Sequence, residues 1–113
     1  MTFNEYQQEA MRTASCEMNT NINPLLLNGV MGLNGEAGEA LDIVKKYMFQ
    51  GHPLDIEHIV KELSDCAWYL ATAAYGCGYP LEEVISANVK KLRARYPDGF
   101  SAEKSLHRAE GDI

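Results

Sequence analysis

Residues 24–49 read PLLLNGVMGLNGEAGEALDIVKKYMF, a stretch that opens on a proline and is followed by Gly51-His52-Pro53. Proline is favoured at the first helical position, and a glycine with a proline just beyond it ends a helix. The stretch therefore predicts one long helix. Glycine recurs at every third position from 29 to 38. Each such glycine costs up to about 1 kcal/mol relative to alanine, so the series requires close approach of another backbone or a ligand. A kink, or two helices in place of one, is the alternative.

Boundary signals of the same kind predict three more helices. Thr2 with Glu5 matches a capping box, Asp55 is placed as an N-cap, and Pro80 opens the last helix. No segment alternates like a strand over more than a few residues. The chain is therefore predicted to be all-α, with helices over about residues 2–17, 24–49, 55–75 and 80–95.

Length and composition limit the classes of function. The 113 residues suffice for one small domain, and so short a chain buries little of its surface alone, which favours oligomerisation. The net charge of −6 argues against a general binder of nucleic acid or anionic membranes. The longest apolar stretch, around 67–75, is too short to span a membrane, and residues 1–20 are not expected to act as a signal peptide.

The cysteines indicate a reduced, cytoplasmic setting. There are three, Cys16, Cys66 and Cys77, and none forms a Cys-x-x-Cys pair. Cys66 and Cys77 lie in apolar stretches, so both are predicted to be small core residues.

Two acidic pairs carry the strongest functional signal: Glu36 with Glu39, and Glu62 with Asp65. A spacing of three places both carboxylates of a pair on one helical face. If the two faces turn toward each other, four like charges meet and need cations between them. Such an oxygen nest suits Mg²⁺ or Mn²⁺, and Mg²⁺ is commonly held by carboxylates together with substrate phosphates. The pairs predict magnesium-dependent chemistry on a phosphate ester or anhydride. A solvated surface is the alternative for either pair alone.

Basic, aromatic and amide side chains share faces with these pairs or with one another: Lys46, Tyr69, Asn88, Lys91 and Arg95. Basic groups suit phosphates, and an aromatic ring with an asparagine suits a nucleobase, so a nucleotide site is predicted. Alternatively, the basic residues are ordinary surface charges, and Trp68 and Tyr69 belong to the core. The chain has no P-loop motif, and no histidine has the Glu-x-x-His spacing of di-iron bundles.

Residues 35–42 (GEAGEALD) with Lys45-Lys46, and residues 61–71 (KELSDCAWYLA), together resemble the MazG-like nucleoside triphosphate pyrophosphohydrolases of the all-α NTP pyrophosphatase superfamily. Residues 87–92 (ANVKKL) and 95–101 (RYPDGFS) resemble the third block of that family, so the resemblance spans about residues 30–106. Ser64 stands where family members often have glycine, and Cys66 and Ala67 stand where bulkier residues are frequent.

The resemblance implies a single all-α domain over residues 1–113 with a four-helix-bundle-like core, assembled as a homodimer or homotetramer. The parts would be an N-terminal helix within 1–20, a helical core with the metal site over 24–96, and a polar C-terminal tail over 97–113.

The resemblance also implies hydrolysis of an NTP or dNTP between the α and β phosphates, giving the monophosphate and pyrophosphate. It assigns the Mg²⁺ (or Mn²⁺) ligands, which are also the catalytic residues, as Glu36, Glu39, Glu62 and Asp65. A metal-activated water would attack the α-phosphorus. The implied substrate contacts are Lys45 or Lys46, Lys91 and Arg95 for the phosphates, and Tyr69, Asn88 and Trp68 for the base or sugar. Two alternatives stay open: a phosphoribosyl-ATP pyrophosphohydrolase of the same superfamily, and a non-catalytic helical adaptor or nucleotide-binding regulator.

Overall fold

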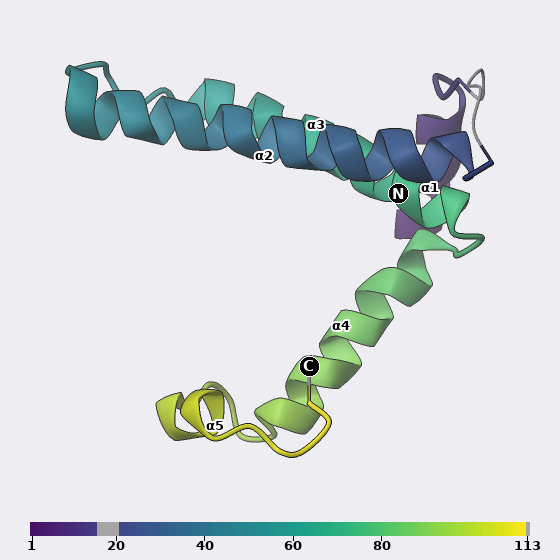
Figure 1. The fold of residues 1–113 in the computed structure, drawn as a ribbon, viewed down its shortest axis with the longest axis vertical. Coiled ribbons are helices and arrows are strands. Elements are labelled where there is room, and N and C mark those ends of the chain that lie inside the picture. Colours follow the sequence, from purple (N-terminus) through teal and green to yellow (C-terminus); the bar gives the residue numbers. More distant parts are fainter. Residues whose placement is uncertain (16–20, 113) are drawn as a thin grey trace. The chain divides into compact units, whose positions relative to one another are not determined.

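The structure is a computed structural model and describes residues 1–15 and 21–112. Its regular elements are all helices, and the described residues contain no strand, which confirms the all-α prediction. The chain divides into two compact units, Met1–Leu81 and Glu82–Ile113. The helices, labelled in Figure 1, are α1 (Phe3–Met11), α2 (Pro24–Gln50), α3 (Ile56–Gly76), α4 (Leu81–Arg95) and α5 (Ala102–Leu106).

Helix α2 is continuous from Pro24 to Gln50, so the glycine series neither kinks nor divides it. The side-chain oxygen of Asn23 caps its first turn by accepting a hydrogen bond of 2.9 Å from the backbone N–H of Leu25. Gly51 adopts the left-handed conformation, with φ of 70°, and its N–H bonds the carbonyl of Lys46. Local signals at the two ends therefore set the length of this helix.

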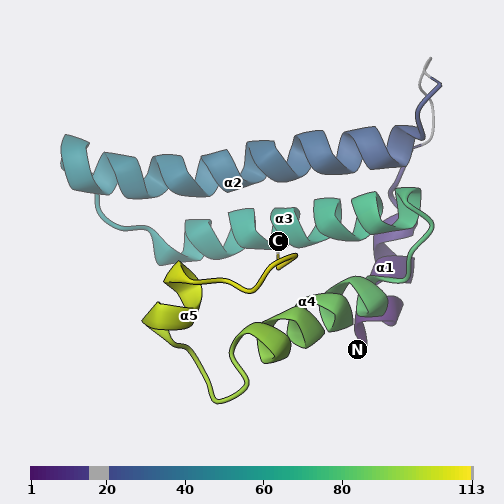
Figure 2. The ribbon, with the colours of Figure 1, turned by 60° about the horizontal axis from the view of Figure 1, so that its bottom comes forward.

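Two of the glycines in α2 lie where α3 packs most closely, and the two helices run side by side in both views of the ribbon (Figures 1 and 2). A Cβ placed on Gly29 would lie 2.5 Å from the backbone nitrogen of Ala73, and one placed on Gly32 would overlap the ring of Tyr69. The predicted close approach is therefore confirmed for these positions. The pairings run in opposite directions along the two helices, which makes α2 and α3 antiparallel.

Helix α1 is joined to α3, and to the turn that follows it, by one buried glutamine. The amide nitrogen of Gln7 donates to the carbonyls of Ala71 (3.3 Å) and Tyr79 (3.0 Å). Its oxygen accepts a hydrogen bond of 3.1 Å from the backbone N–H of Leu81. Gln7 is only 3% exposed, and these three bonds satisfy an amide that would otherwise be costly to bury.

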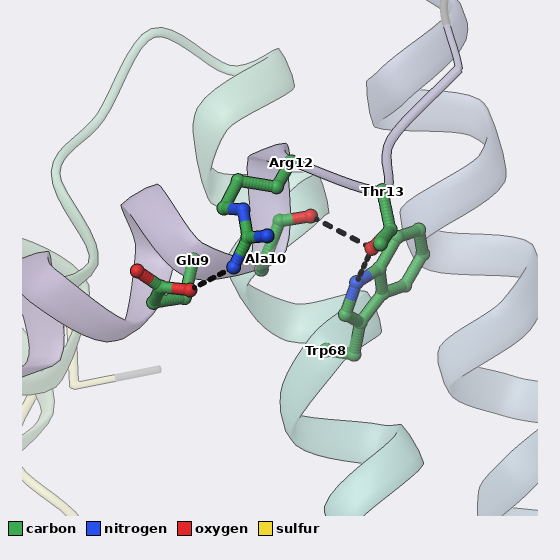
Figure 3. Close-up of polar contacts among 5 residues, drawn as sticks. All are labelled: Glu9, Ala10, Arg12, Thr13 and Trp68. Carbon is green, nitrogen blue, oxygen red and sulfur yellow. Dashed lines mark hydrogen bonds and ion pairs between the residues drawn. The ribbon is translucent and has the colours of Figure 1, made fainter.

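The prediction that the first helix reaches about Glu17 is wrong, because α1 ends at Met11. Cys16 and Glu17 lie outside the described residues. Figure 3 shows the physical reason: the hydroxyl of Thr13 donates to the carbonyl of Ala10 (3.1 Å) and accepts from the indole nitrogen of Trp68 (2.9 Å). A threonine hydroxyl that bonds the last turn in this way competes with helix continuation.

The second unit holds the rest of α4, the short helix α5 and the segment that follows. Residues 97–113 were predicted as a polar tail, and the structure adds α5 within this segment. The hydroxyl of Ser101 caps this helix by accepting from the backbone N–H of Lys104 (3.3 Å). Before α5, the rings of Tyr96 and Phe100 pack with centroids 5.4 Å apart. These contacts lie within the second unit.

Burial corrects the expectation for one cysteine. Cys66 is half-buried on α3, but Cys77 is exposed, because it lies in the turn after α3 has ended at Gly76. Over residues 1–15 and 21–112, no helix combines the length and the apolar character needed to cross a bilayer.

Candidate active site

Three carboxylates converge where α2 and α3 face each other. Glu36 comes from α2, and Glu62 and Asp65 come from α3. Each offers an oxygen, and these three oxygens all lie within 4.8 Å of one another. Glu36 follows the close contact at Gly32 by about one helical turn, so the tight packing there brings acidic side chains from two helices together. The predicted meeting of the two acidic faces is present for these three residues.

The electrostatics of this acidic cluster, Glu36 with Glu62 and Asp65, favour a bound positive charge. The pKa of Glu36 is raised, first by a hydrogen bond with Glu62, then by burial, and then by the charges of Asp65, Glu62 and Glu39. A hydrogen bond between two carboxyl groups requires a proton on one of them. Without a cation the cluster therefore retains a proton more strongly than a lone carboxylate does.

The donor set fits Mg²⁺ or Mn²⁺. Both are hard cations that prefer oxygen ligands, and carboxylates are their usual protein ligands. All three members of the cluster offer carboxylate oxygens, close enough together to share one ion or adjacent ions. Repulsion among them would be relieved by the same cation.

Glu39, the fourth predicted ligand, lies next to the cluster. It is exposed on α2, one turn beyond Glu36, and its charge contributes to the raised pKa of Glu36. With Asp42, Lys46 and His58 it lines a hollow of about 240 Å³ near the end of the α2–α3 hairpin. Its role as a metal ligand stays a prediction.

Sequence reasoning named no partner for His58, and the structure supplies one. The Nε2 atom of His58 lies 2.8 Å from Oε1 of Glu62, one turn further along α3. The signal that could have found it is the i, i+4 spacing of the two residues. His58 is therefore a further residue of the candidate site, in contact with a predicted metal ligand.

Tyr6 is a second residue that the sequence did not assign to the candidate site. Burial raises the pKa of its phenol, and the charge of Asp65 raises it further. The phenol therefore stays protonated and can donate a hydrogen bond near the cluster. No spacing rule links residue 6 to residue 65, so only the packing of α1 on α3 reveals this relation.

The two predicted phosphate contacts on α2 share one carboxylate. Lys45 and Lys46 lie 3.0 and 2.9 Å from different oxygens of Asp42. These hydrogen bonds, led by the one to Lys46, lower the pKa of Asp42. The bond with Asp42 also raises the pKa of Lys46, which keeps its charge. Both ammonium groups are held near the hollow, and their contact with phosphate stays a prediction.

The two aromatic residues predicted to contact the base or sugar lie in the packing between helices. The ring of Tyr69 covers Gly32, and Trp68 meets Tyr69 edge to face with centroids 5.0 Å apart. The indole nitrogen of Trp68 is bonded to Thr13 (Figure 3). Both side chains are half-buried, so each combines a packing role with a partly accessible surface. Their contact with substrate stays a prediction.

The remaining predicted substrate contacts lie on α4, in the second unit. Asn88 and Lys91 are exposed, and Arg95 is bound through its guanidinium to Asp112. The acidic cluster belongs to the first unit, Met1–Leu81. That these three residues act on the same substrate as the cluster stays a prediction.

Comparison with known families supplies an independent finding. The family model of the MazG nucleotide pyrophosphohydrolase domain matches residues 27–100. This span contains Glu36, Glu39, Glu62 and Asp65, and it leaves α1 and α5 outside the match. No curated protein and no solved structure gives a significant match to the chain.

Proposed function

The chain belongs to the MazG nucleotide pyrophosphohydrolase family, and from that we propose that it hydrolyses a nucleoside or deoxynucleoside triphosphate between the α and β phosphates. The products would be the monophosphate and pyrophosphate, and the reaction would need Mg²⁺ or Mn²⁺. The observation that carries the proposal is the meeting of Glu36, Glu62 and Asp65 within 4.8 Å in a chain of this family.

Glu36, Glu62 and Asp65 would hold the cation, with Glu39 as a fourth carboxylate from the next turn of α2. When bound, a divalent cation supplies charge neutralisation on the phosphates and a more acidic water. His58 contacts one oxygen of Glu62 and would help to orient this carboxylate toward the cation. These residues therefore provide an ordered acidic surface against which a triphosphate, itself anionic, binds only together with cations.

Other residues would bind and orient the substrate. When substrate binds, Lys46 and Lys45 would release Asp42 and bind the more highly charged phosphate oxygens. The protonated phenol of Tyr6 would donate a hydrogen bond beside Asp65. Tyr69 and Trp68 would offer ring surface to the base or sugar.

We further propose that the protein is a homodimer or homotetramer, assembled through one apolar face of the α2–α3 hairpin. Val30 and Leu63 lie one residue after Gly29 and Glu62, which face the neighbouring helix. Along an α-helix, each side chain is rotated about the helix axis by about 100° from the one before it, always in the same direction. Because the helices are antiparallel, both side chains reach the same face. The large apolar side chains that remain exposed along this face are Val30, Leu41, Met48, Ile56, Val60 and Leu63. So extended an apolar face favours burial against another surface.

A nucleotide panel tests the activity. The purified chain is incubated with Mg²⁺ and each common NTP or dNTP, with phosphoribosyl-ATP as a separate arm, and products are separated by ion exchange. We expect monophosphate with pyrophosphate, and no turnover when a chelator removes the metal. Diphosphate with orthophosphate would contradict the proposed bond. Turnover of phosphoribosyl-ATP alone would select the alternative within the superfamily.

Substitution of the acidic residues tests the site. Asp65→Asn and Glu39→Gln should each lower kcat by at least about 100-fold, because charge stabilisation in the transition state is lost. Glu57→Gln removes the same charge from an exposed position of α3 and serves as the control. Near-normal pyrophosphate release by Glu39→Gln would show that Glu39 is not part of the catalytic site. Joint stabilisation by Mg²⁺ and a non-hydrolysable nucleotide, without turnover, would indicate a nucleotide-binding regulator.

A further inference from the structure

The second unit contains a basic hollow that lies largely beyond the matched part of the chain. It has a volume of about 460 Å³ and is formed by the end of α4 and the segment from α5 onward. Its lining includes Lys91, Arg95, Lys104, His107, Arg108 and Asp112. Four of the ten lysines and arginines of the chain therefore line one hollow, although the net charge of the protein is −6. Such a concentration of positive charge suits an anion.

One carboxylate already occupies this hollow. Nε of Arg95 lies 2.7 Å from Oδ2 of Asp112, and a terminal guanidinium nitrogen lies 2.7 Å from Oδ1. The two side chains are only 10% and 17% exposed. Two parallel hydrogen bonds from a guanidinium are also the arrangement in which arginine binds phosphate. Asp112 therefore holds the position and the geometry that a phosphate group would take.

Other positively charged side chains also act on the carboxylate of Asp112. The pKa of Asp112 is lowered, first by its hydrogen bonds to Arg95 and then by the charges of Arg95, Arg108 and Lys91. Asp112 brings a single negative charge, and its two oxygens are both used by Arg95. A phosphate group carries more charge and three acceptor oxygens, so it can satisfy Arg95 and a second cation together. The four cations of the lining outnumber its two carboxylates, Glu110 and Asp112.

We propose that this hollow is a polyphosphate-binding site, and that Asp112 occupies it in the free protein as an internal competitor of the phosphate. The identity of the anion rests on the proposed function, since Lys91 and Arg95 are expected to contact the phosphates of the substrate. Lys104 and Arg108 lie after residue 100, where the family match ends. The ligand is the phosphate chain of the nucleotide or the released pyrophosphate.

Calorimetric titration of the full chain with pyrophosphate, in the presence of a chelator and without nucleotide, tests the site. Asp112→Asn should bind pyrophosphate about tenfold more tightly than the parent chain. Without the competing carboxylate, a larger fraction of the protein has Arg95 free to bind phosphate. Asp112→Ala should do the same, and circular dichroism checks that both keep their helix content. Glu110→Gln is the matched control, since it removes an equal charge from the same wall.

Adding Arg95→Gln to Asp112→Asn should abolish the gain in pyrophosphate affinity. Equal gains for Asp112→Asn and Glu110→Gln would overturn the proposal, because net charge alone would then explain them. Tight binding that survives Arg95→Gln would overturn it as well.

A second arm identifies the source of the phosphate. If the nucleotide is the ligand, Asp112→Asn lowers KM for the triphosphate. If Asp112→Asn binds pyrophosphate more tightly but has an unchanged KM for the triphosphate, the product is the ligand. If neither pyrophosphate affinity nor KM changes, the proposal is overturned. Failure of the proposed function is a separate result: the chain would hydrolyse no nucleotide, while pyrophosphate binding would still respond to Asp112→Asn.

Discussion

His58 contacts Glu62 through a single short interaction, with Nε2 of the histidine 2.8 Å from Oε1 of the glutamate. The side chain of Glu62 is only 12% exposed, whereas that of His58 is 53% exposed. Glu62 is therefore both the partner of His58 and one of the three carboxylates of the acidic cluster. Loss of a partner that fixes the orientation of a metal ligand typically costs about 10- to 100-fold in metal affinity.

We expect His58→Ala to weaken binding of Mn²⁺, used as a probe for the metal, by roughly 10-fold or more. His58→Gln keeps an N–H donor and should lose less. The measurement is a calorimetric Mn²⁺ titration without nucleotide, so it does not depend on turnover. His52→Ala removes a second histidine from the same hollow and is the control. If His58→Ala binds Mn²⁺ as well as the parent chain does, His58 does not orient Glu62.

The raised pKa of Glu36 predicts how the metal-free protein responds to pH. An acid with a higher pKa in the folded state binds its proton more strongly there than in the unfolded chain. Its contribution to stability is complete below its ordinary pKa of 4.5 and is lost as the pH rises through the raised value. Glu36→Gln should therefore be more stable than the parent chain at neutral pH, and the difference should shrink toward pH 4.

Thermal unfolding in a chelating buffer at a series of pH values measures this difference. Adding Mg²⁺ at neutral pH should then raise the Tm of the parent chain more than that of Glu36→Gln, because a ligand stabilises only the form that binds it. Parallel pH profiles for the two proteins would show that the carboxylates do not destabilise each other.

The ends of α2 could be predicted because they depend on neighbours in sequence. Pro24 and Gly51 are enough, and the predicted end differs from the observed one by a single residue. The end of α1 could not be predicted, because Thr13 bonds Trp68 at a distance of 55 residues along the chain. Local propensity favours a longer helix there, and a tertiary contact overrides it.

The candidate site shows the same division between local and distant determinants. Spacing alone placed Glu62 and Asp65 on one face, and the glycines of α2 predicted that another backbone or a ligand comes close to this helix. The relation of Tyr6 to Asp65 depends on where α1 packs, and the pairing of Arg95 with Asp112 depends on how the chain folds back after α4. Neither relation leaves a periodic signal in the sequence.

The glycines of α2 offer a matched stability experiment. Gly29→Ala and Gly32→Ala would place a methyl group against α3 and should each lower the free energy of unfolding by about 1–3 kcal/mol. A Cβ on Gly35 or Gly38 meets nothing within 4 Å. Gly35→Ala and Gly38→Ala should therefore raise the free energy of unfolding, each by up to about 1 kcal/mol, through better helix propensity.

Urea unfolding of the four variants checks the contrast. Equal losses at all four positions would mean that a further surface also approaches Gly35 and Gly38. A loss of turnover without a loss of stability in Gly35→Ala would instead indicate that the substrate passes close to this backbone, next to Glu36.

The apolar face of the α2–α3 hairpin predicts the response of the assembly to a buried charge. Leu41 is 67% exposed and Leu63 is 56% exposed, so in an isolated chain a charged residue at either position would remain solvated. In an oligomer that covers this face, the same charge would be desolvated without a partner, which is costly. We expect the parent chain to sediment as a dimer or tetramer, and Leu41→Glu and Leu63→Glu to sediment as smaller species with intact helix content. Gln8→Glu, at an exposed position of α1, is the control. A parent chain that sediments as a monomer, and loses stability on Leu41→Glu, would instead show that the chain covers this face with a segment of its own.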